Sequence, residues 1–497
     1  MQFLGFVGPS YRYESLPIDS QRCINWYTEK TGNKNSSSPY VLKPTCGYKK
    51  VIEIIDDTLP KGSYVRALYR TTKGLGLTPD NGGSVIAVIG PNVYWIKRDF
   101  TYQKLGAMSY KTTTVSIVDD GFSGCLVDGT GMYNLDLETL AFTKNDFALT
   151  DPSNVIFSSG YTLCIGQKEN LPQNTFFWTD KPYDNNLWGA SDYASAEESA
   201  DPINGLICAS GYVYLFGKKS FELWGKTGDK DLPFQRSFAS SGSVGLLAPK
   251  SLASIQDAVF FIGSNSNGSA IAYMLRGTDV TRISDYPLEE EWGSTDVTDA
   301  TAWTYSKNGH IFWVLNFDKL DKTYVYDLTE GEWHECASRD PITDKLHRWK
   351  PNYCVSTDEG ILVGDRSGSN IYLLDNAYTL ENGNPIVRQR TTAHVKAELN
   401  IFSVDNLIFD MDTGNGITKE NPDRYGESPI CMMRYSWDSG RTYSSEIREG
   451  LGETGDYKKV LRYSRLGRGR VFTVDFKISD NCNTSVLGAF IDLTVAK

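Results

Sequence analysis

The chain has 497 residues, a formal net charge of −11, 45 glycines and 12 % aromatic residues. Sequence-independent DNA binding needs clustered lysine and arginine that release counterions, so this charge excludes a protein that grips DNA over its whole surface. Because no apolar run reaches about 18 residues, we expect no membrane-spanning helix and no membrane insertion.

Residues 1–60 show no clean hydrophobic periodicity, and we expect an extended N-terminal segment there. The stretch from Met1 to Leu4 has neither a basic flank nor an apolar core, so no signal peptide is predicted. We interpret the segment as an irregular strap over the first repeat unit. The alternative is an exposed arm that grips a neighbouring chain.

Short strands and turns repeat at regular intervals over residues 61–380. The first strands of successive units are centred on Val65, Ile117, Phe157, Ile207, Ile255, Trp303 and Val355. Spacings of about 40–50 residues are typical of β-propeller blades. With six or seven such units, residues 61–380 are predicted to form a β-propeller.

The clearest unit spans residues 203–251, with predicted strands at 203–209, 212–216 and 221–224. The middle strand is apolar at nearly every position, so both of its faces should be buried. A small sheet packed between two similar sheets explains this pattern, and that arrangement is a propeller blade. The aromatic side chains expected between blades are those of Trp224, Phe261 and Trp313.

Beyond residue 381 the repeat stops. A turn-rich linker at 381–385 is followed by longer predicted strands at 388–398, 405–410, 432–436, 470–478 and 487–495. Residues 381–497 are therefore predicted to form a second all-β domain that resembles a β-sandwich. The fold class predicted for the whole chain is all-β.

Short motifs along the chain resemble one known family. They are Gln21-Arg22-Cys23-Ile24-Asn25, Tyr214-Leu215-Phe216-Gly217 with Glu222 and Trp224, Ala248-Pro249-Lys250-Ser251, and Arg465-Leu466-Gly467. These motifs are similar to those of the packaged-DNA stabilisation proteins of short-tailed phages (podoviruses), also called tail hub or nozzle proteins. The resemblance touches the start, the middle and the end of the chain.

This resemblance implies a structural protein of the virion tail that is assembled in the cytoplasm of the host bacterium. Such proteins form a ring, commonly a homo-hexamer, below the portal and its adaptor. The ring extends the DNA exit channel, stabilises packaged DNA, and connects to a needle or plug protein and to tailspikes. It encloses double-stranded DNA without sequence-specific binding, so a low positive charge is an advantage.

No catalytic residue, cofactor or metal ion is predicted. Residues 211–220 have the wrong spacing for a phosphate loop, and residues 410–421 lack the ligands of a calcium loop. The four histidines never pair at zinc-ligand spacing, and nine cysteines without a C-x-x-C motif favour a reducing compartment. The acidic runs 119–120 and 289–291 are interpreted as solvated loops; the alternative for the second run is contact with a partner.

One motif favours a different function. It resembles the Asp-box of sialidases and consists of Ser436, Asp438, Gly440, Thr442 and Tyr443. We interpret it as a structural hairpin turn in which the aspartate caps loop amides. The rival hypothesis is a tail-associated glycan-binding or sialidase-like propeller that acts on host surface polysaccharide. A third hypothesis, a monomeric cellular propeller scaffold, leaves the N- and C-terminal motifs unexplained.

A basic segment runs from Lys458 to Arg470 and contains no acidic residue. Three interpretations remain open for it: a solvated hairpin end, a DNA contact, or an interface with another subunit or tail protein. We favour the interface, because arginine side chains form paired hydrogen bonds with carboxylates of a partner. The arginines that we assign to this interface are Arg462, Arg465, Arg468 and Arg470.

Overall fold

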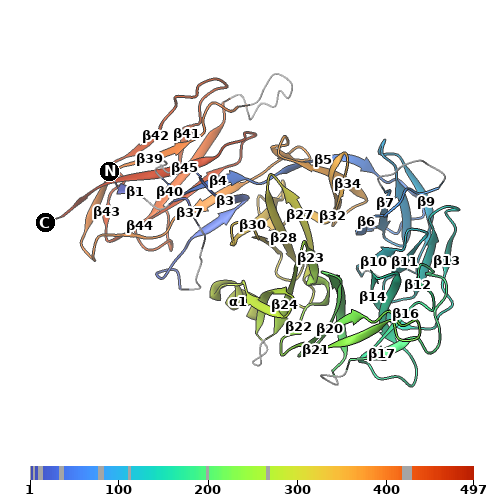
Figure 1. The fold of residues 1–497 in the computed structure, drawn as a ribbon. Coiled ribbons are helices and arrows are strands. Elements are labelled where there is room, and N and C mark those ends of the chain that lie inside the picture. Colours follow the sequence, from blue (N-terminus) through green and yellow to red (C-terminus); the bar gives the residue numbers. More distant parts are fainter. Residues whose placement is uncertain are drawn as a thin grey trace.

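The structure, a computed structural model, describes residues 2–3, 6–8, 10, 15–32, 38–76, 83–109, 113–196, 201–264, 269–416 and 428–496. Within these ranges one α-helix, α1 (Tyr286–Gly293), and a short 3-10 helix, η1 (Pro249–Ser251), interrupt an otherwise all-β chain. The strands form a propeller and, beside it, a sandwich, and both termini lie at the far end of the sandwich (Figure 1). The all-β fold class, with a propeller followed by a sandwich, is thus confirmed.

The described strands build seven blades, which settles the choice between six and seven. The first blade contains β6 (Val65–Arg70), β7 (Val85–Ile89), β8 (Asn92–Ile96) and β9 (Tyr102–Ala107). The second contains β10 (Ser116–Asp119), β11 (Ser123–Val127), β12 (Met132–Asp136) and β13 (Phe142–Lys144). The third contains β14 (Thr150–Ser158), β15 (Tyr161–Gln167), β16 (Thr175–Trp178) and β17 (Tyr193–Ser195). Each is a four-stranded antiparallel meander in chain order.

The next three blades follow the same plan with additions at their edges. The fourth blade contains β18 (Ile203–Ala209), β19 (Tyr212–Gly217), β20 (Phe221–Lys226) and β21 (Phe234–Gly242). The fifth contains β22 (Gly245–Leu246), β23 (Ala253–Ile255), β24 (Ala258–Ser264), β25 (Ala270–Arg276) and β26 (Asp279–Arg282). The sixth contains β27 (Thr301–Lys307), β28 (His310–Phe317), β29 (Lys322–Asp327), β30 (Glu332–Arg339) and β31 (Leu346–Arg348). All seven residues on which the sequence centred the first strands lie in inner strands of the blades.

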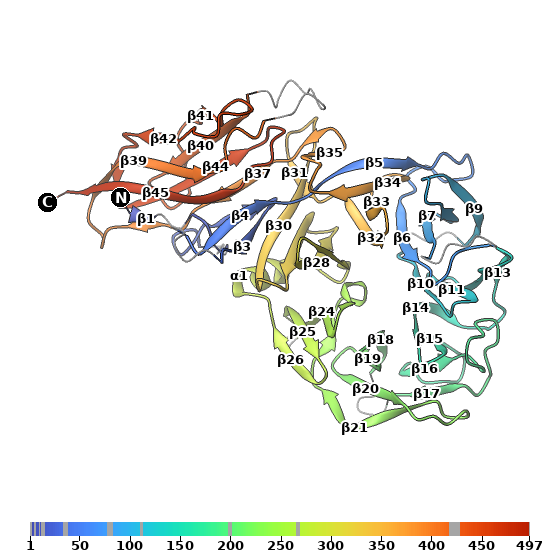
Figure 2. The ribbon, with the colours of Figure 1, turned by 45° about the horizontal axis from the view of Figure 1, so that its top comes forward.

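The seventh blade takes its outer strand from the N-terminal segment. It consists of β32 (Pro351–Thr357), β33 (Gly360–Asp365), β34 (Asn370–Asp375) and β5 (Gly47–Glu53), with β35 (Leu380–Glu381) and β36 (Asn384–Pro385) beyond. β5 pairs antiparallel with β34 and runs beside it in Figure 2. Residues 47–53 were expected to belong to an irregular strap over the first repeat unit, and that expectation is wrong for them. They form a regular strand because Tyr48 packs into the last blade and Ile52 packs between the last blade and the first.

The interfaces between blades are packed with aromatic rings. Trp224, Phe261 and Trp313 are 5 %, 0 % and 1 % exposed, as the sequence predicts. The ring of Trp313 stacks on Phe260 of the preceding blade, with 5.4 Å between ring centroids. Closing a sheet series into a ring in this way removes most of its free edges.

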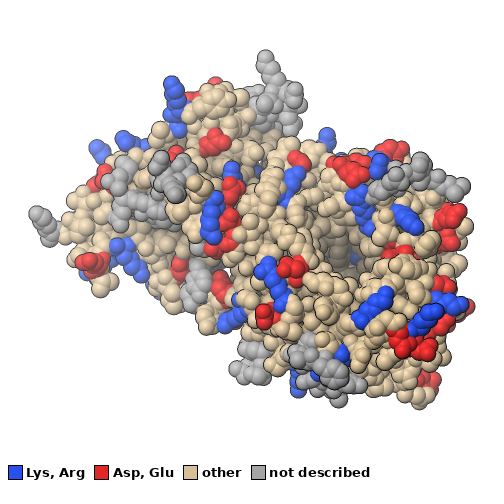
Figure 3. Space-filling model, in the orientation of Figure 1, with Lys and Arg blue, Asp and Glu red and all other residues tan. Residues whose placement is uncertain are grey.

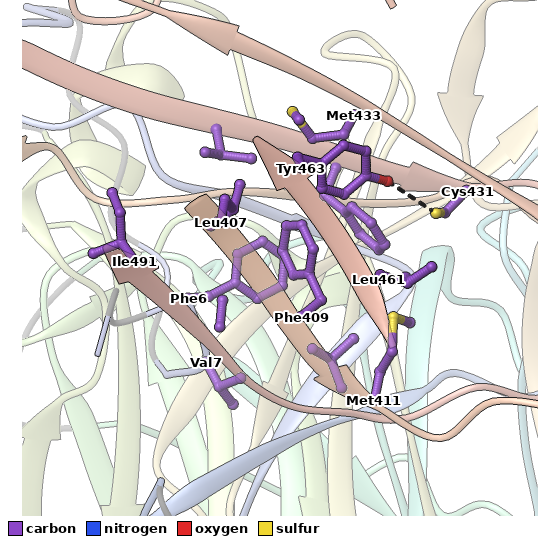
Figure 4. Packing of buried hydrophobic residues seen from close by; sticks show 14 of the residues in the cluster. Phe6, Val7, Leu407, Phe409, Met411, Cys431, Met433, Leu461, Tyr463 and Ile491 are labelled. Atoms are coloured by element: carbon purple, nitrogen blue, oxygen red, sulfur yellow. Dashed lines mark hydrogen bonds between the residues drawn. The ribbon is translucent and has the colours of Figure 1, made fainter. Parts of the chain in front are cut away.

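The sandwich consists of two facing sheets. One contains β3 (Trp26–Lys30), β4 (Tyr40–Pro44), β45 (Val486–Val495), β39 (Phe402–Met411) and β42 (Leu461–Ser464), with β1 (Gln2–Phe3) and β43 (Arg468–Gly469) at its margins. The other contains β2 (Arg22–Ile24), β37 (Arg388–Thr391), β44 (Val471–Ile478), β40 (Ile430–Ser436) and β41 (Ile447–Gly450), with β38 (Val395–Lys396) beside β44. Phe6, Phe409, Met433 and Tyr463 meet in the core between them (Figure 4).

One sheet continues from the propeller into the sandwich. β2 pairs in parallel with β30 of the sixth blade and antiparallel with β37 of the sandwich. Arg22 forms two hydrogen bonds with the carboxylate of Glu335, at 2.9 and 2.7 Å. The Asn25 amide donates to the carbonyls of Ala337 and Val387, both at 2.8 Å. The N-terminal segment is therefore the joint between the two parts of the chain.

Candidate functional site

The Asp-box-like turn, residues 436–443, follows β40. Hydrogen bonds from its own side chains stabilise it. The Ser436 hydroxyl accepts a hydrogen bond from the backbone N–H of Gly440 at 2.9 Å. The Asp438 carboxylate accepts from the backbone N–H of Thr442 at 2.8 Å and from its hydroxyl at 2.6 Å. Ser439 and Gly440 have φ of +62° and +83°, the left-handed conformation that a tight hairpin turn requires.

The electrostatics of this turn suit a structural role for the Asp438 carboxyl group and not the role of a proton donor. Hydrogen bonds from Thr442 lower the pKa of Asp438 to about 2, so the carboxyl group is ionised at neutral pH. A glycosidase acid needs the opposite, a pKa raised toward neutrality. The ring of Tyr443 lies against the Arg434 guanidinium, 4.6 Å from the ring centroid. The geometry therefore fits the interpretation of a structural turn.

Replacing Asp438 with alanine should lower the free energy of unfolding by about 1 kcal/mol, because the amide and hydroxyl of Thr442 lose their acceptor. No catalytic activity should disappear with it. The measurement is a denaturant midpoint together with an assay for sugars released from host polysaccharide.

Asp438→Asn is the matched control, because it keeps one oxygen acceptor and should lose less stability. Polysaccharide release by the unmodified protein that Asp438→Ala abolishes would contradict a structural role and support the glycan hypothesis.

The four arginines of the predicted interface lie along one edge of the sandwich. β42, which carries Arg462, and β43, which begins with Arg468, both pair with β39, so they follow the same strand. The side chains of Arg462, Arg465, Arg468 and Arg470 are all exposed. Within the described ranges these four arginines form no ion pair, whereas Lys459 of the same segment pairs with Glu449 at 3.1 Å.

Among the described strands, β42 lies at the edge of its sheet and has open backbone groups. The backbone N–H of Arg465 donates to the carbonyl of Asp405 on β39 at 3.0 Å. Because hydrogen-bonded and non-bonded pairs alternate along an antiparallel ladder, the backbone groups of Arg462 and Ser464 point away from β39. Such an edge is a template for a strand from another chain. The exposed arginines lie beside this edge.

The acidic run 289–291 lies on α1, not in a loop as expected. Glu289 accepts from the Arg282 guanidinium at 2.7 and 2.6 Å, and Glu291 contacts Lys322 and Tyr324. A groove of about 740 Å³ lies between α1, β30 and the N-terminal segment. Two ion pairs, Arg22–Glu335 and Lys322–Glu291, cross this groove and connect its walls.

The expectation of a solvated loop at Asp119 and Asp120 is wrong. The two side chains are 2 % and 6 % exposed. Asp119 accepts from the Tyr69 hydroxyl at 2.8 Å, and Asp120 accepts from the backbone N–H groups of Phe122 and Ser123, both at 2.7 Å. Hydrogen bonds to amides and hydroxyls compensate for burial of these carboxylates.

The described residues contain neither a metal-ligand cluster nor a membrane-spanning helix. In that part of the chain no group of three or more His, Cys, Asp or Glu side chains is arranged to hold a metal ion. The helices described there are too short and too polar to cross a membrane. Acidic and basic side chains are interspersed over the face shown in Figure 3.

Comparison with known families gives the decisive observation. The family model described as "Bacteriophage P22 Gp10, beta-propeller" matches residues 80–379, and "Bacteriophage P22 Gp10, beta-sandwich" matches residues 387–494. The chain belongs to the bacteriophage P22 Gp10 family. This is the tail hub, or nozzle, family that the sequence motifs indicate, so that prediction is confirmed. A search of curated proteins found no match.

Several solved structures resemble the Gp10-family chain only distantly. The extracellular domain of a hybrid two-component system from B. thetaiotaomicron is 9 % identical with a TM-score of 0.43, and the likeness covers 84 % of this chain and 47 % of that one. The chain thus spans about half the length of that protein. The N-terminal domain of Nup159 is 13 % identical with a TM-score of 0.39, over 72 % of this chain and 100 % of that one. At such TM-scores these likenesses carry no argument about function.

Membership of the Gp10 family identifies the chain as a structural tail hub protein of a phage, with its place in the virion tail. Both family models lie within the two parts that the structure describes. β2, which joins those parts, and β5, the outer strand of the seventh blade, precede the matched residues.

Proposed function

We propose that this Gp10-family chain assembles into a homo-hexameric ring in the cytoplasm of the host bacterium. The ring extends the DNA exit channel below the portal and adaptor, stabilises the packaged DNA, and connects to a needle or plug protein and to tailspikes. The observation that carries this proposal is the match of both the propeller and the sandwich to one tail hub family.

The charge of the chain supports a conduit. Six copies of a chain with net charge −11 carry −66 formal charges, which repel DNA phosphates. A channel that must release its genome gains from this repulsion, because phosphate contacts by lysine and arginine would hold the DNA. The arginines of the sandwich edge are accordingly assigned to protein contacts, either between subunits or with a tail partner.

Reversing Arg465 and Arg468 to glutamate should leave the single chain folded, because exposed charges contribute little to stability. The double variant should assemble less than the unmodified protein, since it meets partner carboxylates with like charge. Raised salt should weaken assembly of the unmodified protein in the same direction. The measurement is assembled mass by light scattering across a salt series, with and without the tail adaptor.

The matched control is Arg441→Glu with Arg448→Glu, which makes the same charge change at exposed positions elsewhere on the sandwich. It should assemble normally. Equal assembly of both double variants at every salt concentration would show that residues 462–470 are merely solvated. If the unmodified protein stays monomeric with the adaptor present, the proposal that it assembles into a ring is contradicted.

A further inference from the structure

A polar cavity of about 150 Å³ lies where three parts of the chain meet. The β3–β4 hairpin, the end of the seventh blade and the sandwich each contribute side chains to its walls. The lining residues include Glu29, Lys43, Asn376, Thr379, Arg388 and Ser485. Since a water molecule occupies about 30 Å³ of liquid, the cavity has room for one small polyatomic ion with a few waters.

Arg388 is a fully buried guanidinium group in the wall of this cavity. Its side chain is 1 % exposed, and its Nε and Nη1 atoms have no hydrogen-bond partner among the described residues. Glu381 acts on its charge at longer range, but no described carboxylate forms a hydrogen-bonded ion pair with it. A buried charge without a partner is strongly destabilising. An anion that supplies hydrogen-bond acceptors would lower the free-energy cost of burying this guanidinium group.

Nearby ionisable groups do not replace such an anion. Burial lowers the pKa of Arg388, and the groups that oppose this are Cys482, Glu381 and Cys46. Burial raises the pKa of the Glu381 carboxyl to about 7, and its oxygen accepts from the Trp349 indole N–H at 2.9 Å. The Cys46 thiol has its pKa raised to about 12 by burial, so it is neutral.

Arg390, two residues further along β37, is a second buried arginine with which Arg388 can be compared. Its side chain is 0 % exposed. Its guanidinium donates to the carbonyl of Phe6 at 2.9 Å and to the amide oxygen of Gln21 at 2.7 Å. The same strand therefore carries one arginine that donates to two oxygens of the chain and one, Arg388, that lines a cavity.

The remaining walls suit an anion. Lys43 adds a second positive charge, and Ser485 adds a hydroxyl group. Glu29 is the carboxylate among the lining residues, and it lies 3.4 Å from the Nε2 atom of His310. Two cations against one carboxylate leave the cavity with a net positive charge.

We propose that this cavity binds a small free oxyanion, of phosphate or carboxylate type, on the guanidinium of Arg388. Guanidinium groups match the oxygens of both anions in geometry and charge. Because its walls come from the hairpin, the propeller and the sandwich, the bound anion links all three and stiffens the joint. This inference is independent of the ring and its partners.

The test uses the full chain, dialysed into Tris chloride and titrated with phosphate or acetate at matched ionic strength. Calorimetry should show one saturable site per chain for at least one of the two anions, and the two arms distinguish the tetrahedral from the planar ligand. At about a hundredfold excess over Kd the melting temperature should rise by about 2–4 °C. Ion chromatography of protein denatured after purification detects an anion that resists dialysis.

Arg388→Met should abolish the saturable site and the shift in melting temperature. Arg390→Met is the matched control, since it removes a buried arginine from the same strand outside the cavity; it should lose stability and keep the site. Arg448→Gln is a surface control and should bind the anion as the unmodified protein does. If Arg388→Met does not fold, Lys43→Gln should weaken binding about tenfold by removing the second cation.

Three outcomes would overturn the proposal. The first is neither saturable binding nor a released anion from the unmodified protein, which means that water alone fills the cavity. The second is undiminished binding by Arg388→Met. The third, where that variant does not fold, is undiminished binding by Lys43→Gln.

Discussion

Replacing Trp313 with alanine should lower the free energy of unfolding by about 3–5 kcal/mol, the range for truncating a large core aromatic residue. Trp313 is 1 % exposed and stacks on Phe260, with 5.4 Å between centroids, and its ring lies 6.0 Å from that of Trp333. Alanine leaves a cavity at the interface of the fifth and sixth blades that the surrounding strands cannot fill. The measurement is the denaturant midpoint and slope, followed by an aromatic circular dichroism signal.

Ile342→Ala is the control for this substitution. Ile342 is 92 % exposed, so removing its side chain should shift the midpoint by no more than the error. If the two variants unfold at the same denaturant concentration, the packing between these blades does not limit the stability of the propeller.

Replacing Arg66 with alanine should cost about 3–5 kcal/mol for a different reason, because it leaves a buried carboxylate without its counterion. Arg66 and Asp128 pair at 2.8 Å with side chains 1 % and 0 % exposed. The same guanidinium donates to the carbonyls of Thr113 and Gly90, at 2.6 and 2.8 Å. It therefore ties the first blade to the second, and the variant should unfold at a lower denaturant concentration.

Arg70→Ala provides a control on the same strand. Arg70 pairs with Asp358 at 2.9 Å, but the two side chains are 29 % and 55 % exposed. Water screens such a pair, so its loss should cost about 0–1 kcal/mol. Equal losses for Arg66→Ala and Arg70→Ala would show that burial does not set the strength of the Arg66–Asp128 pair.

Local patterns predicted the blades well. An inner blade strand is recognised from its own apolar residues and the turns on either side, and the seven predicted centres lie in the seven inner strands. The turn at Asp438 was predictable for the same reason, because its hydrogen bonds join residues only two to four positions apart.

Long-range pairing escaped prediction. β5 reads as irregular because its burial depends on β34, and the backbone N–H of Lys50 meets Asn382 332 positions away. Asp119 was assigned to solvent because acidic pairs usually lie there, yet Tyr69 and Thr72 from another blade enclose it. The cavity at Arg388 combines the hairpin, the seventh blade and the sandwich, so no stretch of sequence contains its signature.

The joint made by β2 also sets the order in which the chain can fold. The side chain of Asn25 binds Ala337, 312 positions later. At ribosomal speeds of about 5–20 residues per second, β2 waits about 15–60 s before this partner is synthesised. Until then its backbone groups, like those of β5, are unpaired strand edges that other nascent chains can capture. Translation speed and chaperone occupancy over this interval therefore bear directly on the yield of correctly closed propellers.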